Sequence, residues 1–246
     1  AWRMSRRCRA MFLWLALISL GFGGLAPAMA QSSGVLREVY TGFPNGSLSS
    51  LTNNAAFPSN PTTESIEANF EAPAEWSDYY GQRMTALLVP PVTGQYVFWI
   101  ATDDQGALFL STDENPAHKT QIAWVNAWTS SREWNKEANQ KSVSISLTNG
   151  RRYYIEALQS EGGGGDNLAV TWQKPGDAVP AVGAPPILGT YLVPVGLTAP
   201  IITGQPTNTS VVEGGTATFT VRLQRYLGAT FQWLRNGTNI PGATNF

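Results

Sequence analysis

Two consecutive acids, Asp103 and Asp104, lie in the turn of the stretch WIATDDQGALFLSTD. A turn between two apolar runs needs only one or two residues with permissive backbone preferences, and Gln105-Gly106 supplies part of that. Two unit negative charges about 4 Å apart repel each other by roughly 4 kcal/mol at an effective dielectric constant of about 20. The turn contains no Lys or Arg, and the closest one in sequence is Lys119. The pair predicts either a site for a hard cation such as calcium or a solvated turn whose acids point apart.

The chain offers few residues for any other kind of site. His118 is the only histidine, no serine lies in a nucleophile elbow, and the only cysteine, Cys8, precedes the apolar N-terminal run. A Ser-His-Asp triad, a two-histidine zinc site and a Cys-His pair are therefore excluded or left without a partner. Adjacent aspartates suit chelation better than acid-base work, which needs two carboxyl groups that flank a bond. Glycoside hydrolysis remains an alternative, because five acids could approach one another: Asp103, Asp104, Glu156, Glu161 and Asp166. We rank binding above hydrolysis and predict that the protein is not an enzyme.

A second stretch, EGGGGDNLAV at 161–170, could complete a cation site. Four glycines would let backbone carbonyls approach an ion, and Asp166 and Asn167 add side-chain oxygens where the next strand begins. Such a site forms only if this loop and the acidic turn emerge at the same end of the domain. The residues expected at the site are Asp103, Asp104, Asp166 and Asn167 as metal ligands, and Gly163 and Gly164 in the ligand-binding loop.

Short apolar runs separated by Gly, Pro, Asn and Ser are typical of an all-β protein. Five runs are predicted to be strands: 95–102, 107–112, 141–148, 152–159 and 168–173. The run at 95–102 is apolar on both faces, which predicts a central strand covered on both sides. In the run at 141–148, Val143, Ile145 and Leu147 alternate with serines, as in a half-buried strand.

The first 30 residues have the pattern of a secretory signal peptide. Four arginines precede a long apolar run, and the small residues Ala28 and Ala30 stand before Gln31. Cleavage there would change the formal net charge from −1 to −5, and a mildly acidic surface argues against a nucleic-acid partner. No later segment is long and apolar enough to cross a bilayer. We expect an exported protein, secreted or held at the cell surface, with no membrane span in the mature chain.

The composition changes after residue 192. A connector rich in Pro and Gly, at 193–200, precedes a stretch at 201–246 that resembles the first half of a bacterial immunoglobulin-like domain. The turn at 213–215, the alternating run at 216–221 and Trp233 in FQWLRNG carry this resemblance. Val221 stands where such domains often have their first core cysteine, which fits a disulfide-free variant. The expected fold is a large two-sheet antiparallel β-sandwich at 34–192, followed by a partial immunoglobulin-like β-sandwich and by further C-terminal domains.

Two long runs, at 70–116 and 131–176, resemble the protective-antigen type of β-sandwich domain. Four motifs recur in the family's order: PVTGQYVFWI, DDQGALFLS, YYIEAL and EGGGGDNLAVTW. The resemblance implies a twisted two-sheet sandwich. In fungal adhesins of this family, two successive aspartates joined by a cis peptide chelate calcium, which binds sugar hydroxyls, and Asp103 and Asp104 match that pair. An asparagine and backbone carbonyls of a second loop complete those sites; Asn167 is the match, with Asp166 as the alternative.

Three tryptophans, Trp124, Trp128 and Trp134, cluster in IAWVNAWTSSREW. One exposed ring could stack on a sugar, with Trp128 as the candidate, whereas at least two of the three are expected to bury the loop against the core. The leading hypothesis is a calcium-dependent carbohydrate-binding or adhesion module with a glycan or polysaccharide ligand. The alternatives are a structural or protein-interaction spacer in which calcium only stabilises loops, and a targeting module of an exported glycoside hydrolase.

Overall fold

The computed structural model describes residues 33–42, 45–195, 201–207, 209–212, 215–224 and 232–244. The predicted signal peptide at 1–30 lies outside the described residues. The chain divides into two compact units, one of residues Ala30–Gly196 and one that contains Leu197–Phe246. Each unit is described by itself.

The larger unit consists mainly of strands. Its described strands are β1 (Val35–Thr41), β2 (Thr63–Glu67), β3 (Tyr80–Leu88), β4 (Gly94–Asp103), β5 (Gly106–Leu110), β6 (Thr120–Val125), β7 (Ile145–Leu147), β8 (Tyr153–Glu161), β9 (Asn167–Gln173) and β10 (Leu192–Pro194). One short α-helix, α1 (Leu48–Thr52), and three 3-10 turns, Pro116–His118, Ala138–Gln140 and Gly189–Tyr191, lie between them.

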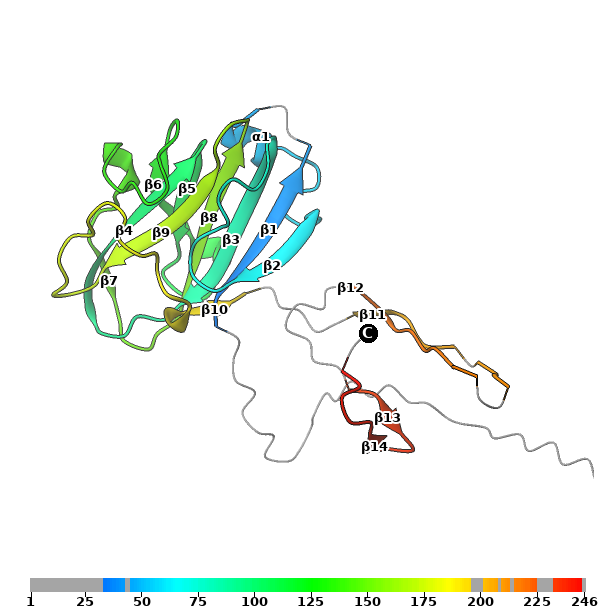
Figure 1. The fold of residues 1–246 in the computed structure, drawn as a ribbon. Helices are drawn as coiled ribbons and strands as arrows, with labels where there is room; N and C mark the ends of the chain where they lie inside the picture. Colours follow the sequence, from blue (N-terminus) through cyan, green and yellow to red (C-terminus); the bar gives the residue numbers. More distant parts are fainter. Residues whose placement is uncertain are drawn as a thin grey trace, which may run out of the picture. The chain divides into compact units, whose positions relative to one another are not determined.

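Two antiparallel sheets pack face to face (Figure 1). The larger sheet has seven strands in the order β2-β1-β3-β8-β5-β6, with β10 also paired to β3. The smaller sheet has the order β7-β4-β9. Met84 and Ile155 from the larger sheet and Phe98 and Val170 from the smaller one belong to the same buried cluster. This arrangement confirms the predicted all-β, two-sheet antiparallel sandwich.

Strand β4 is covered on both faces, as its sequence predicts. Phe98 and Ile100 face the core between the sheets, whereas Trp99 and Ala101 pack on the opposite face with Trp134. The strand is hydrogen-bonded to β7 on one side and to β9 on the other. Its C-terminal residue is therefore held firmly at one end of the sandwich.

The outer face of the larger sheet is covered near the same end by α1. Leu51 packs with Tyr40 and Leu158, and Ser47 caps the helix by accepting a hydrogen bond from the Ser50 N–H. The N–H of Leu48 donates to the Gln105 side chain at 3.1 Å. This contact ties the start of α1 to the turn between β4 and β5.

The run at 141–148 is shorter as a strand than predicted. Pairing with β4 covers only Ile145–Leu147, and the Val143 side chain is 78% exposed rather than half-buried. The N–H of Phe98 is bonded to the Ser142 hydroxyl, and the Phe98 carbonyl accepts from the Ser142 N–H. The prediction was wrong at Val143 because these two bonds to Ser142 replace the regular ladder before β7 begins.

The tryptophan prediction was also wrong in number. Only Trp134 is fully buried, whereas Trp124 and Trp128 are 37% and 49% exposed. Trp124 lies in the edge strand β6, where Ala123 and Val125 face the core and Trp124 therefore faces outward. Of the three tryptophans, Trp134 alone buries this stretch against the core.

In the smaller unit, β11 (Ile201–Gly204) pairs with β12 (Arg222–Gln224), and β13 (Leu234–Arg235) pairs with β14 (Thr238–Asn239). The described residues 216–220 and Val221 form no strand, contrary to the predicted alternating run, because the ladder with β11 begins only at Arg222. The immunoglobulin-like identity of this unit stays a prediction. Strand β10 extends the larger sheet to Pro194, two residues into the expected connector.

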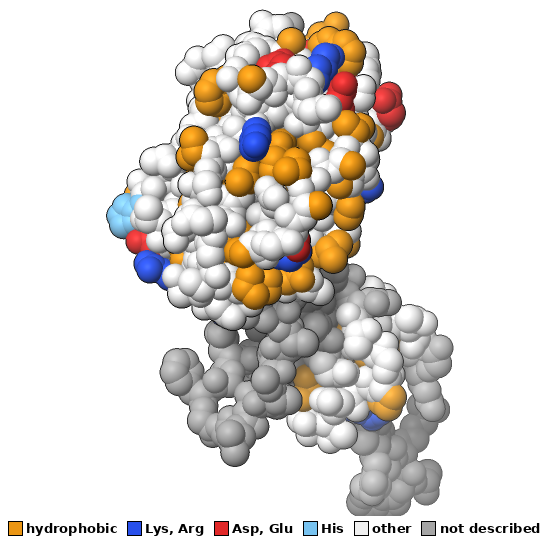
Figure 2. All heavy atoms as spheres, turned by 90° about the vertical axis from the view of Figure 1, so that its left-hand side faces the viewer, with side chains coloured by type: hydrophobic (Ala, Val, Ile, Leu, Met, Phe, Trp, Pro, Cys, Tyr) orange, Lys and Arg blue, Asp and Glu red, His pale blue; other side chains and the backbone are white. Residues whose placement is uncertain are grey.

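The surface of one face is drawn in Figure 2, where charged side chains of both signs are scattered and form no continuous basic patch. Within the described part of the chain, no helix has the length and hydrophobicity needed to cross a bilayer.

Candidate metal centre

The two consecutive aspartates stand where β4 ends. Asp103 is the last residue of the strand and lies opposite Asn167, the first residue of β9, in the β4–β9 ladder. The peptide bond between Asp103 and Asp104 is cis, as the family resemblance implies. Both side chains are partly exposed to solvent.

A third acid, Glu161, completes the cluster on its buried side. One carboxylate oxygen each of Asp103, Asp104 and Glu161 lies within 4.8 Å of the other two. Glu161 is fully buried, and among the described residues neither of its carboxylate oxygens accepts a hydrogen bond of regular geometry. The backbone N–H of Asp104 favours the charged form only slightly, less than burial and the neighbouring acids oppose it. A buried charge that no donor or cation compensates is costly in a folded protein, so the chemistry of this group suits a cation ligand.

The alternation of β8 explains why Glu161 faces inward. Tyr153, Ile155 and Ala157 point into the core between the sheets, and a strand places every second residue on the same face. Gln159 and Glu161 continue that series beyond the apolar part of the core. Gln159 donates a hydrogen bond to the carbonyl of Asp103, which fixes the backbone at the start of the acidic turn.

The glycine loop folds back beside the aspartates, which meets the condition that the sequence left open. The N–H of Gly162 donates to Oδ2 of Asp104 at 3.0 Å. A Cβ on Gly46, just before α1, would lie only 2.1 Å from the same oxygen. Asp104 is thus enclosed between two glycines from distant parts of the chain.

The two predicted ligands at the start of β9 have different surroundings. Asn167 donates from Nδ2 to the carbonyl of Thr129 at 2.8 Å, and its buried Oδ1 has no hydrogen-bond partner in the described part of the chain. Asp166 accepts the N–H groups of Trp76 and Ser77 on Oδ2, at 2.7 and 2.9 Å, while its Oδ1 is buried without a partner. Asp166 therefore anchors the segment 75–79, and its carboxylate is not among the three that cluster.

Burial and mutual repulsion raise the pKa values of two acids in the cluster, Glu161 and Asp103. Burial, together with the charges of Asp104 and Asp103, raises the pKa of Glu161 to about 8. Burial and the charge of Asp104 raise the pKa of Asp103 to about 6, against the opposing effect of Lys136. Without a cation, the cluster therefore retains protons at a pH where isolated carboxyl groups would have lost them.

The donor set fits calcium better than a softer metal. All three donors are carboxylate oxygens, and no histidine or cysteine takes part. Calcium binds oxygens at about 2.3–2.6 Å, so two ligands on opposite sides of one ion lie about 5 Å apart. The three carboxylate oxygens lie within 4.8 Å of one another, which satisfies that limit. Within the described residues, no other group of three such side chains lies close enough together to hold a metal ion.

One rim of the site is the segment 126–140, which is fastened to β4. The N–H of Thr129 donates to the Thr102 carbonyl at 2.7 Å, and Gln140 donates to the Ile100 carbonyl at 2.9 Å. Trp128 forms an isolated bridge with Asp103. The Lys136 ammonium lies 2.7 Å from the centroid of the Trp128 ring. One face of the predicted sugar-stacking ring is therefore covered by a cation.

A second rim is the segment 75–79, which is bonded to the glycine loop. Besides the two bonds to Asp166, the Tyr79 N–H donates to the Gly162 carbonyl at 3.1 Å. The Gly164 N–H donates to Oδ1 of Asp78, also at 3.1 Å. The predicted loop residues Gly163 and Gly164 thus lie against this rim, whereas Gly162 of the same loop contacts Asp104.

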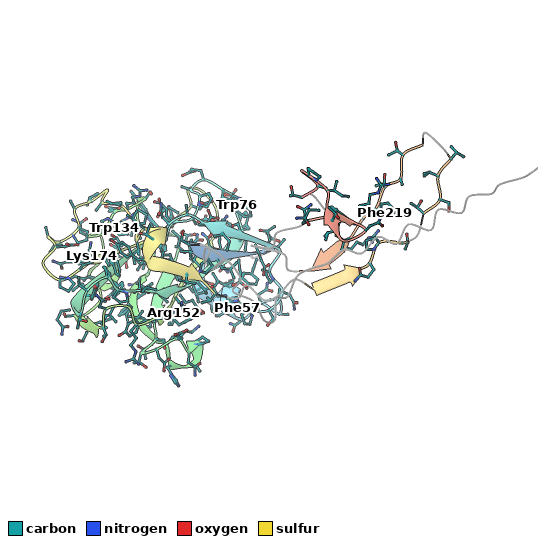
Figure 3. All side chains as sticks on the ribbon, turned by 90° about the horizontal axis from the view of Figure 1, so that it is seen from below. Phe57, Trp76, Trp134, Arg152, Lys174 and Phe219 are labelled. Carbon is teal, nitrogen blue, oxygen red and sulfur yellow. The ribbon has the colours of Figure 1, made fainter. Side chains whose placement is uncertain are left out.

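Four residues of this assembly were not assigned to the site from the sequence. Glu161 appeared only among acids that could approach the pair, although the alternation of YYIEALQSE places it on the core face. Gly46 and Lys136 carry no local signal, because each lies far from the acidic turn in sequence. Trp76, labelled in Figure 3, was not singled out either.

Comparison with known proteins identifies the family of the larger unit. A family model described as the PA14 domain matches residues 31–184. The chain is 31% identical over 141 residues to a mouse N-acetyl-beta-glucosaminyl-glycoprotein 4-beta-N-acetylgalactosaminyltransferase 1, covering 55% of this chain and 14% of that protein. It is 34% identical over 86 residues to dog fibrocystin, covering 30% of this chain and 2% of that protein. The chain thus spans only a small part of these curated relatives.

Among solved structures, the chain is similar to a PA14 sugar-binding domain from an RTX adhesin, with a TM-score of 0.47 and 13% identity, covering 65% of this chain and 97% of that chain. It is also similar to the epithelial adhesin 9 A domain from Candida glabrata in complex with Galb1-3GlcNAc. That match has a TM-score of 0.47 and 14% identity, and covers 68% of this chain and 91% of that chain.

Proposed function

Because the chain belongs to the PA14 domain family, we propose that its sandwich is a calcium-dependent carbohydrate-binding or adhesion module, in which Asp103, Asp104 and Glu161 hold the ion. The observation that carries this proposal is the buried Glu161 carboxylate, which accepts no hydrogen bond of regular geometry from the described residues and has two further carboxylates within 4.8 Å. A divalent cation would neutralise most of that charge and use the lone pairs that no donor reaches.

The surroundings of the cluster suit a ligand that binds to the ion from solvent. Glu161 and the free Oδ1 of Asn167 are buried, whereas Asp103 and Asp104 are partly exposed. The buried oxygens would hold calcium from the protein side. Calcium takes about six to eight oxygen ligands, so positions on the open side remain for adjacent hydroxyls of a sugar. Calcium supplies the charge, while the two rims determine which sugar fits.

Calorimetric titration with calcium tests the metal centre. The double variant Asp103→Asn with Asp104→Asn is expected to stay folded and to bind no measurable calcium. Glu114→Gln removes one acid at an exposed position outside the cluster and serves as the matched control. Undiminished calcium affinity in the double variant would contradict the proposal.

A glycan array with and without chelator tests the ligand class. The wild-type module is expected to bind sugars in calcium and to release them when a chelator is added. Calcium binding without any chelator-sensitive sugar signal would favour the alternative in which the ion only stabilises loops.

The flanking segments complete the proposal. We propose that residues 1–30 direct export and that 201–246 begin an immunoglobulin-like spacer, so that the module is secreted or displayed at a cell surface. The sequence pattern of each segment supports these assignments. N-terminal sequencing of the exported protein should read from Gln31, and retention of the first 30 residues would contradict the export signal.

A further inference from the structure

Three exposed aromatic side chains lie in the two rims of the metal centre. Trp76 is 40% exposed, Tyr79 is 54% exposed and Trp128 is 49% exposed. Trp76 and Tyr79 belong to the rim at 75–79, and Trp128 belongs to the rim at 126–140. A ring stacks on a sugar only if one of its faces is free, so the contacts of each ring decide which one can serve.

Two of the three rings already have partners. Trp76 packs edge-on against Tyr80, with ring centroids 4.8 Å apart, and the Arg37 guanidinium lies 4.9 Å from its centroid. The Lys136 ammonium lies over Trp128. A neutral sugar could stack on the covered face of Trp128 only by displacing this cation.

Tyr79 differs from both. Within the described part of the chain, its ring contacts no other ring and no cation, and its hydroxyl makes no hydrogen bond. Its backbone has a φ of 54°, in the left-handed region that bulky residues rarely adopt. The N–H of Tyr79 is nevertheless bonded to the Gly162 carbonyl, so the surrounding structure holds the residue in this conformation.

The free ring lies next to the loop that binds Asp104. Its hydroxyl oxygen and Cζ are 3.6 and 3.7 Å from the position that a Cβ on Gly163 would occupy. The neighbouring residue, Gly162, donates its N–H to Asp104. Gly163 has no side chain, so it places no atoms between the tip of the Tyr79 ring and the metal centre.

From this arrangement we propose that Tyr79 is a stacking surface for a second sugar unit, and that the ligand is an oligosaccharide rather than a single monosaccharide. This inference rests on the proposed function. The first unit presents adjacent hydroxyls to the ion, and the next unit lays its apolar face on the uncovered ring of Tyr79. Aromatic rings combine apolar area with little conformational freedom, which makes an exposed and anchored tyrosine suited to this role.

Matched pairs of sugars on one array, in the presence of calcium, test this proposal: galactose and lactose, glucose and cellobiose, N-acetylglucosamine and chitobiose, mannose and mannobiose. Wild type is expected to bind the disaccharide of at least one pair more tightly than its monosaccharide. Tyr79→Ala should weaken that disaccharide about three- to tenfold and leave its monosaccharide and the calcium affinity unchanged. Tyr79→Phe keeps the ring and should bind as wild type does.

The remaining outcomes each overturn the proposal in a recognisable way. Unchanged disaccharide affinity in Tyr79→Ala refutes the stacking surface but leaves the calcium-dependent module intact. An equal loss for monosaccharide and disaccharide places the ring against the first sugar and refutes the second unit. Absence of chelator-sensitive binding to every sugar overturns this inference together with the proposed function.

Discussion

Gly162 donates its backbone N–H to Oδ2 of Asp104 across 58 positions of the sequence. The hydrogen bond joins the loop after β8 to the turn after β4, so it fixes the distance between the two loops that form the candidate metal centre. The same oxygen faces Gly46 so closely that a Cβ there would lie 2.1 Å away. Both glycines therefore set the position of Asp104.

We predict that Gly46→Ala displaces the Asp104 carboxylate and weakens calcium binding by at least about tenfold, as is usual when groups that orient metal ligands are changed. The fold should persist, because Gly46 lies outside the two sheets. Calorimetric titration with calcium measures the loss, and circular dichroism verifies the fold.

Gly163→Ala provides the matched control within the glycine loop. The nearest atom to its added Cβ is 3.6 Å away, an ordinary contact, so calcium affinity should not change. Equal calcium affinities for Gly46→Ala and wild type would show that the enclosure of Asp104 by Gly46 has no part in binding.

Two glutamates of β8 allow a comparison within one strand. Glu161 accepts no hydrogen bond of regular geometry from the described residues, whereas Glu156 is bonded to Lys119 and to the Tyr154 hydroxyl, each at 2.5 Å. We predict that Glu161→Gln raises the free energy of unfolding in chelator at pH 8, because it removes a buried charge that nothing compensates, and lowers calcium affinity at least about tenfold.

Glu156→Gln should show the opposite pattern. It leaves the calcium affinity unchanged and lowers the free energy of unfolding by about 1 to 3 kcal/mol, since it weakens hydrogen bonds to a charged group. Chemical denaturation with and without calcium separates the two effects. Similar behaviour of the two variants would mean that Glu161 is an ordinary structural acid.

The acidic pair, the central strand and the glycine loop were predictable because each is a local pattern. DDQG stands out as an excess of charge in a turn, QYVFWIAT shows its burial in an unbroken apolar run, and EGGGGDN is a clear composition signal. The dependence of the site on contact between the two loops was also foreseeable, although the contact itself was not.

The rest of the site depends on tertiary contacts that no local pattern records. Gly46 and Lys136 reach the acidic turn only because the segments before α1 and after β6 fold over the same end of the sandwich. Val143 was assigned to a strand because its alternation is regular, yet the bonds of Ser142 to Phe98 end the ladder before it. Alternation shows which face a residue would occupy and does not show where pairing begins.

The raised pKa values of Asp103 and Glu161 predict how the stability of the metal-free protein depends on pH. Both groups bind protons more tightly in the folded state than in the unfolded chain, where carboxyl groups titrate near pH 4. Their contribution is most favourable below about pH 4 and is lost as pH rises through about 6 and then about 8. In chelator, the melting temperature should therefore fall between pH 5 and pH 8.

Calcium should reverse this trend, because it binds the deprotonated carboxylates. The increase in melting temperature on adding calcium is predicted to be larger at pH 8 than at pH 5. Scanning calorimetry at the two pH values measures this difference. A calcium effect that is larger at pH 5 would contradict the assignment of these acids to the metal centre.

Lys136 supplies the last prediction, because its ammonium lies beside the cluster and lowers the pKa of Asp103. This positive charge repels a bound cation, so Lys136→Met should increase calcium affinity by about two- to fivefold, the range typical of one partly exposed charge interaction. The increase should diminish at high salt, where exposed charges are screened. Lys141→Met is the matched control, since the Lys141 ammonium lies 5.5 Å from the Trp99 ring centroid, next to a different tryptophan. Titration of both variants at low and high salt measures the effect, and a decrease in calcium affinity for Lys136→Met would mean that the side chain supports the site rather than opposing the cation.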